Sequence, residues 1–171
     1  KTTAISLLAG EIIPNLGEWE EDGNWDNVID YYAGSDIQKH FIGLSDEKIR
    51  IALKPQYVDR IPKMFDGTLR ELLEKVTSPE KVKEFAEKIN LTSLDKNLSK
   101  VSGGELQKGA IAATLLKDAD LYFFDEPSSY LDIEQRILMA KMISELGEKK
   151  SVIVIEHDLA ILDYVTNNIH V

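Results

Sequence analysis

The chain of 171 residues has no cysteine and only three histidines. Without cysteine it can form no disulfide and no thiolate site for an iron–sulfur cluster, and the scattered histidines argue against zinc. No apolar run approaches the roughly 18 residues of a membrane-spanning helix, and we see no secretory leader. These absences predict a cytoplasmic protein with no membrane partner.

Basic residues are missing from one long stretch of the chain. Residues 11–36 hold eight acidic side chains and no lysine or arginine, within a net charge of −10. Such a charge disfavours nonspecific coating of nucleic acid, because the phosphates repel it. We interpret the stretch as a solvated acidic face, with a docking face for a basic partner as the alternative.

The sequence does contain alternating strand-like and helix-like segments. Hydrophobic patterning predicts strands at 49–53, 121–124 and 152–155, and helices at 2–9, 25–32, 36–41, 106–116 and 133–146. Alternation of this kind predicts an α/β fold with a mostly parallel core sheet. Two insertions interrupt it: a helix-loop-helix at residues 24–43 and a helical subdomain at about 63–117.

Four aromatic residues fall in or near the helix-loop-helix: Trp25, Tyr31, Tyr32 and Phe41. We interpret them as the small core of this insertion. A platform on which nucleic acid bases stack is the alternative.

Ser102-Gly103-Gly104-Glu105-Leu106-Gln107 is the most informative stretch. Ser102 and Glu105 have the spacing of a capping box, which begins a helix. The glycines let backbone N–H groups approach a ligand closely, and a helix N-terminus favours phosphate. In isolation, this pattern describes the start of an ordinary helix.

Polar residues follow each predicted strand. Asp125 and Glu126 end the strand at 121–124, His157 follows the strand at 152–155, and Gln56 follows the strand at 49–53. Open α/β sheets bind ligands at the carboxyl ends of their strands. There Asp125 suits Mg²⁺, Glu126 suits a general base, and His157 suits a γ-phosphate contact. Each alone could be a strand end or a loop residue.

The N-terminal Lys1-Thr2-Thr3 has the residues that close a phosphate-binding loop, G-x-x-x-x-G-K-[ST]. In such a loop the lysine reaches the β- and γ-phosphates and the hydroxyl binds Mg²⁺. The glycines and the strand before them are absent from this sequence, so the three residues acquire meaning only from the motifs that follow.

As an ordered set, these motifs resemble an ABC-type ATPase domain of the P-loop NTPase class, and the match spans essentially the whole chain. Lys54-Pro55-Gln56-Tyr57-Val58-Asp59-Arg60, Asp125-Glu126-Pro127-Ser128-Ser129-Tyr130-Leu131-Asp132 and Glu156-His157-Asp158 are similar to the ribosome-recycling ABC ATPase, or RNase L inhibitor, family. The stretch around Trp25–Phe41 resembles the helix-loop-helix of that family's first nucleotide-binding domain. Short spacers suggest an archaeal member.

The resemblance implies an ATPase that splits ribosomes into subunits through ATP-driven closure of two nucleotide-binding domains. Its partners would be the second nucleotide-binding domain, the small ribosomal subunit, and termination or recycling factors. It also implies ATP and Mg²⁺ as ligands, with 4Fe–4S clusters in a domain outside this chain. The helix-loop-helix would contact the small subunit.

The resemblance also implies roles for individual residues. Catalysis would fall to Glu126 as base, Gln56 and His157. Mg²⁺ would be held by Thr2, Gln56 and Asp125. The remaining residues would bind nucleotide or couple the two sites: Lys1, Thr2, Thr3, Ser102, Gly103, Gly104, Glu105, Gln107 and Asp132.

The sequence departs from the family pattern at Val101, where leucine is usual, and lacks the phosphate-loop glycines, hinges and second ATPase domain. We therefore expect a piece of a longer protein that does not hydrolyse ATP unaided. Two alternatives stay open: the ATPase subunit of an ABC transporter, which would dock near Gln56, and a non-catalytic ABC-like structural domain.

Overall fold

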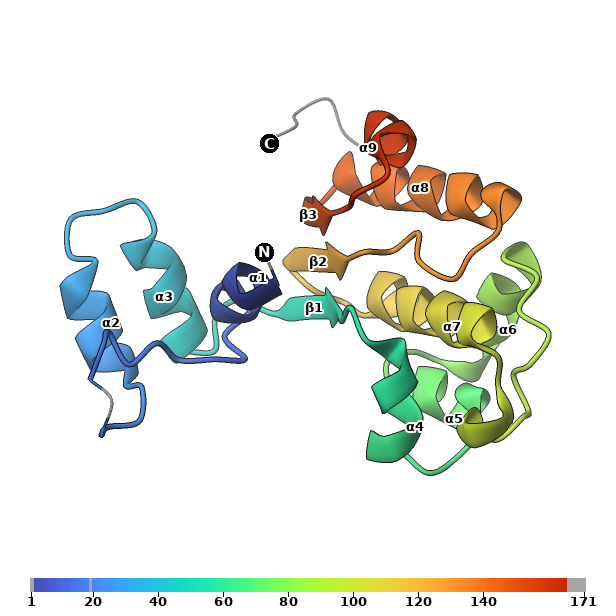
Figure 1. Ribbon diagram of the computed structural model, residues 1–171, viewed down its shortest axis with the longest axis horizontal. Coiled ribbons are helices and arrows are strands. Elements are labelled where there is room, and N and C mark those ends of the chain that lie inside the picture. Colours follow the sequence, from blue (N-terminus) through green and yellow to red (C-terminus); the bar gives the residue numbers. More distant parts are fainter. Residues whose placement is uncertain (1, 19, 166–171) are drawn as a thin grey trace.

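A computed structural model describes residues 2–18 and 20–165. Within this part, three strands form one parallel sheet in the order β1-β2-β3 (Figure 1). The strands are β1 (Ile51–Lys54), β2 (Leu121–Asp125) and β3 (Ser151–Ile155). The predicted parallel α/β sheet is confirmed.

Helices account for most of the remaining structure. They are α1 (Thr2–Leu8), α2 (Trp25–Tyr31), α3 (Gln38–Ser45), α4 (Ile61–Met64), α5 (Leu69–Glu74), α6 (Pro79–Lys88), α7 (Gly103–Leu116), α8 (Ile133–Gly147) and α9 (Leu159–Val165). Short 3-10 turns lie at Val58–Arg60 and Leu98–Lys100. The helix predicted at 36–41 is wrong in its bounds, because Asp36 and Ile37 remain in the turn and α3 continues to Ser45.

The central strand explains why the core forms where it does. Tyr122, Phe123 and Phe124 are buried, as expected for the middle strand of a parallel sheet covered on both faces. Helix α7 packs against β1, α8 packs against β3, and α9 packs against α8. The main hydrophobic core therefore joins the sheet to α5, α6, α7 and α8.

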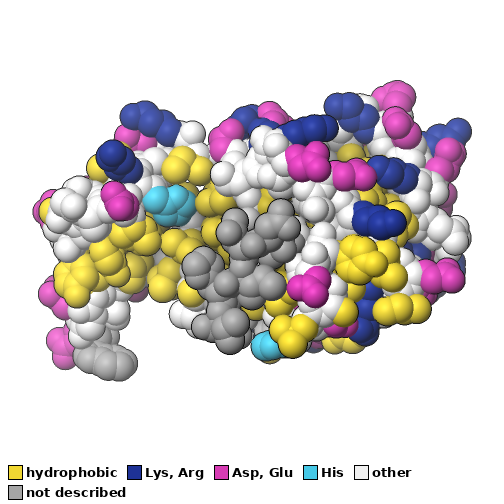
Figure 2. Space-filling view, turned by 90° about the horizontal axis from the view of Figure 1, so that it is seen from above, with side chains coloured by type: hydrophobic (Ala, Val, Ile, Leu, Met, Phe, Trp, Pro, Cys, Tyr) yellow, Lys and Arg dark blue, Asp and Glu magenta, His cyan; other side chains and the backbone are white. Residues whose placement is uncertain are grey.

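The helix-loop-helix forms a separate lobe at the left of Figure 1, where α2 and α3 pack on each other. Phe41 is buried, with Trp25 at 6.0 Å and Tyr32 at 5.2 Å between ring centroids. Tyr31 differs from them, since it is 68% exposed. Figure 2 also shows hydrophobic side chains at the surface of this lobe.

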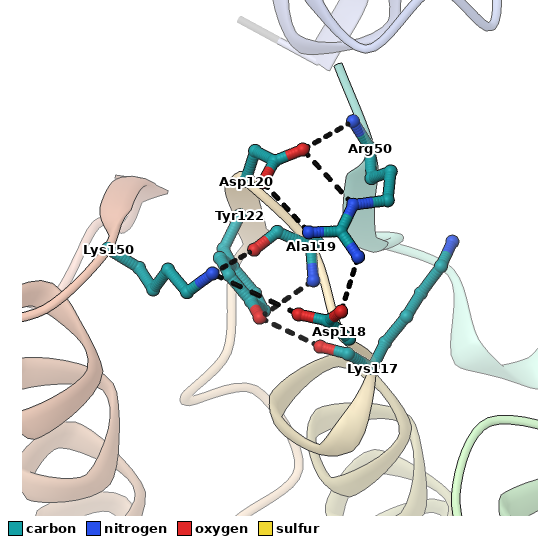
Figure 3. Close-up of polar contacts among 7 residues, drawn as sticks. All are labelled: Arg50, Lys117, Asp118, Ala119, Asp120, Tyr122 and Lys150. Carbon is teal, nitrogen blue, oxygen red and sulfur yellow. Dashed lines mark hydrogen bonds and ion pairs between the residues drawn. The ribbon is translucent and has the colours of Figure 1, made fainter. Parts of the chain in front are cut away.

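An ionic cluster closes the amino ends of the strands (Figure 3). Arg50, just before β1, bonds to Asp118 and Asp120 in the loop that enters β2. Lys150, just before β3, donates to the carbonyl of Ala119 at 2.8 Å. The three strands are thus tied together at the end opposite to their polar carboxyl ends.

Candidate functional site

The carboxyl ends of the three strands bring distant polar residues to one edge of the sheet. Lys54 is paired with Phe124, and Asp125 with Ile155, so the three strands end at nearly the same level. Gln56 follows β1, Glu126 follows β2 and His157 follows β3. A parallel register is what turns these separate sequence motifs into one site.

The carboxylate of Glu126 lies at the centre of this group. Gln56 Nε2 donates to Glu126 Oε1 at 2.9 Å, and His157 Nε2 lies 3.3 Å from the same oxygen. Ser129 Oγ donates to the other oxygen at 3.3 Å. Thr2 Oγ1 reaches Gln56 Oε1 at 3.4 Å, so α1 joins the cluster.

Asp125 has a buried carboxylate that the described residues leave without hydrogen-bond partners. Asp125 is only 2% exposed, and neither of its carboxylate oxygens accepts a hydrogen bond. A buried, unpartnered carboxylate is costly unless a cation is present. Within the described residues no cluster of three acidic, histidine or cysteine side chains forms a metal site. This donor set fits Mg²⁺, which uses one or two carboxylates and completes its shell with phosphate and water.

Lys54 is a feature of the site that the motif analysis missed. Its side chain is wholly buried, and Nζ donates to the backbone carbonyls of Asp125 (2.7 Å) and Glu126 (3.1 Å). Burial lowers the pKa of Lys54 from 10.5 to about 8, although the charges of Asp125, Glu126 and Glu156 act to raise it. Strand periodicity could have found it, because Ala52 and Lys54 occupy the same, buried face of β1.

The Ser102-Gly103-Gly104 segment lies at the start of α7, against the loop that follows Glu126. Ser102 caps α7 by accepting the N–H of Glu105 at 3.3 Å. A Cβ on Gly104 would come within 3.0 Å of the Tyr130 carbonyl oxygen, and one on Gly103 within 3.4 Å of the Tyr130 ring. Gly104 therefore allows α7 to begin against the loop that follows Glu126, whereas a Cβ at Gly103 would make an ordinary van der Waals contact.

Only one of the two hydrogen bonds of the predicted capping box forms, the one in which Ser102 accepts the N–H of Glu105. Glu105 does not return to the N–H of Ser102; its carboxylate accepts the N–H groups of Thr92 and Ser93 at 3.1 Å each and pairs with buried Lys108. Partial burial acts to raise the pKa of Glu105, but the bond and charge of Lys108 and the hydrogen bonds of Ser93 together outweigh it and lower the pKa. Glu105 therefore bonds inward, to the segment before α7.

Gln107 also faces inward, away from the surface that Ser102 occupies. It is wholly buried, and its Nε2 donates to the carbonyls of Glu126 and Pro127 at 2.9 Å each. This geometry gives no support to the predicted nucleotide contact of Gln107. The prediction for Gln107 did not take account of the helical periodicity of α7, which turns the Gln107 side chain toward β2.

The other predicted residues occupy less connected places. Asp132 is exposed and caps α8, since its Oδ1 accepts the N–H of Gln135 at 2.9 Å. Thr3 is exposed on α1. Lys1 lies outside the described residues. Glu156, which the motif analysis did not single out, accepts the N–H groups of Ser128 and His157 and so joins the β2 and β3 loops.

Comparison with known proteins identifies the family to which this chain belongs. The sequence pattern described as ABC transporter matches residues 1–129. The chain belongs to the ABC transporter family. Membership implies binding of a nucleotide with Mg²⁺, the ligands for which the strand-end cluster is suited.

Closer relatives narrow the assignment within this family. An uncharacterized ABC transporter ATP-binding protein of Methanocaldococcus jannaschii is 47% identical over 100% of this chain and 28% of its own length. The solved structure of an RNase-L inhibitor is 48% identical, with a TM-score of 0.89 over 98% of this chain and 32% of that one. The archaeal ribosome recycling factor aABCE1, solved with the ribosomal stalk protein aP1, is 49% identical, with a TM-score of 0.88 over the same shares.

These matches confirm the predicted resemblance of this ABC domain to the RNase L inhibitor group. This chain spans about 28% of the length of the Methanocaldococcus relative. Among the described residues, every helix is too short or too polar to cross a membrane.

Proposed function

We propose that this chain is part of the first nucleotide-binding domain of a ribosome-recycling ABC ATPase. The observation that carries the proposal is the meeting of Gln56 and His157 at the Glu126 carboxylate, beside the unpartnered Asp125 carboxylate. A solved relative at 49% identity is named a ribosome recycling factor, which supports the same biological role.

In this proposal the reaction is ATP hydrolysis by a water molecule in line with the bond that breaks. Glu126 takes the proton of that water as its oxygen attacks the γ-phosphorus, and the bond to the bridging oxygen of ADP breaks. Gln56 orients the water, and His157 contacts the γ-phosphate. Asp125, Thr2 and Gln56 would hold Mg²⁺, whose charge would stabilise the phosphate oxygens in the transition state.

Hydrolysis in this scheme requires closure on a second nucleotide-binding domain. Ser102 and Gly103 are exposed at the N-terminus of α7, as a group that binds the other domain's ATP must be. Exposed Asp132 in the neighbouring loop would couple the two sites. In this proposal any iron–sulfur clusters would belong to a domain outside this cysteine-free chain, and a ribosomal partner would mean a cytoplasmic protein.

The test uses Glu126→Gln in the longer protein to which this chain belongs. The variant should bind Mg·ATP and lose turnover by about a hundredfold or more, because the amide cannot take a proton. Trapped in its closed form, it should co-sediment with the small ribosomal subunit in the presence of ATP. Glu145→Gln, on the exposed surface of α8, is the matched control.

Turnover at the wild-type rate in Glu126→Gln would overturn the assignment of the base. Association with membranes in place of ribosomal subunits would favour a transporter subunit. Absence of ATP hydrolysis from the wild-type protein would favour a non-catalytic role.

A further inference from the structure

Glu126 has a backbone conformation that its neighbours must enforce. Its φ is +48°, in the left-handed region that non-glycine residues seldom adopt. Its N–H donates to the carbonyl of Ile155 at 2.8 Å, which fixes one side of the turn. Strained residues of this kind persist only where the surrounding structure holds them.

The carbonyl side of the same turn is held by two buried side chains. Lys54 Nζ donates to the carbonyls of Asp125 and Glu126, and Gln107 Nε2 donates to those of Glu126 and Pro127. Three successive carbonyls are thus satisfied by two side chains, and the Glu126 carbonyl accepts from both. The amide orientation of Gln107 is fixed, since its oxygen would otherwise face two carbonyl oxygens.

The two donors come from elements with different neighbours in the site. Lys54 ends β1, two residues before Gln56, and Gln107 lies in α7, five residues after Ser102. The turn that carries Glu126 is therefore bonded both to the strand that leads into Gln56 and to the helix that begins at Ser102-Gly103-Gly104.

Placing a lysine at position 54 in the core is energetically unfavourable. Burial of an ammonium group carries a desolvation cost that an apolar side chain of similar length avoids. A backbone carbonyl pair and a nearby carboxylate offset that cost, but methionine would incur none. The presence of a charged donor at Lys54 is explained if the geometry of the Glu126 turn is important for function.

We propose that Lys54 and Gln107 are positioning residues for ATP hydrolysis. By holding the carbonyls of Asp125, Glu126 and Pro127, they keep the Glu126 backbone in its left-handed conformation and its carboxylate directed to Gln56 and His157. The proposal rests on the proposed function, because it gives Glu126 the role of the base. Lys54 and Gln107 are themselves wholly buried, so in this proposal they act only through the turn.

Lys54→Met and Gln107→Met, made separately in the longer protein, test this. Each removes the donors at nearly constant side-chain volume. We expect kcat per ATP-binding site to fall about tenfold or more while KM for ATP stays within about threefold, since only the base is displaced. Lys54→Arg, which retains a buried cationic donor, should recover part of the lost kcat.

Two control variants remove buried hydrogen bonds away from the turn. Thr114→Val removes the bond from Thr114 Oγ1 to the Ala110 carbonyl in α7. Tyr122→Phe removes the bond from the Tyr122 hydroxyl to the Lys117 carbonyl at the opposite end of β2 (Figure 3). Both should lower the melting temperature yet keep the wild-type kcat.

Two outcomes would overturn the proposal and leave the proposed function intact. One is wild-type kcat in both methionine variants while Glu126→Gln is inactive. Another is a loss of ATP binding in step with kcat, which would indicate a merely structural role. If circular dichroism shows that Lys54→Met does not fold, the proposal is decided by Gln107→Met, which replaces a side chain that carries no charge. Absence of hydrolysis from the wild-type protein would instead count against the proposed function.

Discussion

At the scale of single residues, Asp125 and Glu126 show how adjacent carboxylates acquire different properties. The carboxylate of Asp125, the last residue of β2, is buried and has no hydrogen-bond partner among the described residues. Glu126 is turned outward by its positive φ and is contacted by Gln56, Ser129 and His157. The first therefore suits a cation, and the second suits proton transfer.

Asp125→Asn should have different effects on thermal stability and on the binding of Mg·ATP. Without Mg²⁺ the variant should unfold close to the wild-type temperature, because relief from burying a carboxylate without hydrogen bonds is balanced by the lost attraction to the buried Lys54 ammonium. Mg·ATP at about one hundred times its Kd should stabilise the wild type by about 2.7 kcal/mol, and the variant by much less. Thermal unfolding with and without Mg·ATP measures both effects.

The control for this experiment is Asp163→Asn, an exposed position in α9. Its response to Mg·ATP should equal that of the wild type. A full response in Asp125→Asn would show that the carboxylate does not hold the metal ion.

At the scale of elements, α7 is the helix that organises the domain. It begins beside Tyr130, bonds to the Glu126 turn through Gln107, and packs on α5 at Gly109. A Cβ at Gly109 would lie 2.5 Å from Leu69 Cδ1, and Leu69 is wholly buried. The lack of a side chain at Gly109 therefore permits the close approach of the two helices with Leu69 in its present position.

Gly109→Ala should destabilise the protein despite the better helix propensity of alanine. Overpacking in a filled core costs about 1–3 kcal/mol, and the gain in propensity is only about 1 kcal/mol. Gly147→Ala is the matched control, because no heavy atom lies within 4 Å of the added Cβ. Urea unfolding should show a loss of stability for the first variant and none for the second. Equal stabilities would mean that Leu69 can move aside.

At the scale of the whole molecule, the sheet is held at both ends by different means. Buried Lys54 and Gln107 act at the carboxyl ends, and the exposed Arg50 cluster acts at the amino ends (Figure 3). The hydrogen bond from Arg50, together with its charge, lowers the pKa of Asp120 from 3.8 to about 2. This cluster is therefore a source of acid sensitivity distant from the site.

The sign of the pH effect follows from that lowered pKa. Above pH 3.8 the Asp120 carboxylate is ionised in both the folded and unfolded chains, and its full contribution to stability is present. As the pH falls from 3.8 toward about 2, the unfolded chain binds the proton first, and the contribution is lost. Asp120→Asn should remove this part of the pH dependence.

Denaturant unfolding between about pH 5 and pH 2 measures the difference between the two proteins. The wild type should lose more stability than Asp120→Asn over this range. Asp22→Asn, a charge removal in the exposed loop before α2, controls for net charge. Parallel curves for wild type and Asp120→Asn would refute the assigned linkage.

Sequence alone determined the features that depend on neighbours along the chain. The apolar runs predicted the three strands, and Ser102 predicted the start of α7, because strand patterning and helix caps act over a few residues. The order of the motifs predicted the family. Even so, local reasoning misassigned the Glu105 side chain and missed the complete capping box of Thr68 and Glu71 at α5.

Only the tertiary structure decided what meets across long sequence separations. The parallel register brings Gln56 and His157 to Glu126, and it places Lys54 under a turn about seventy residues away. The inward direction of Gln107 likewise depends on where β2 lies against α7. Hydrogen bonds between distant segments are set by how the layers pack, and no local pattern specifies that geometry.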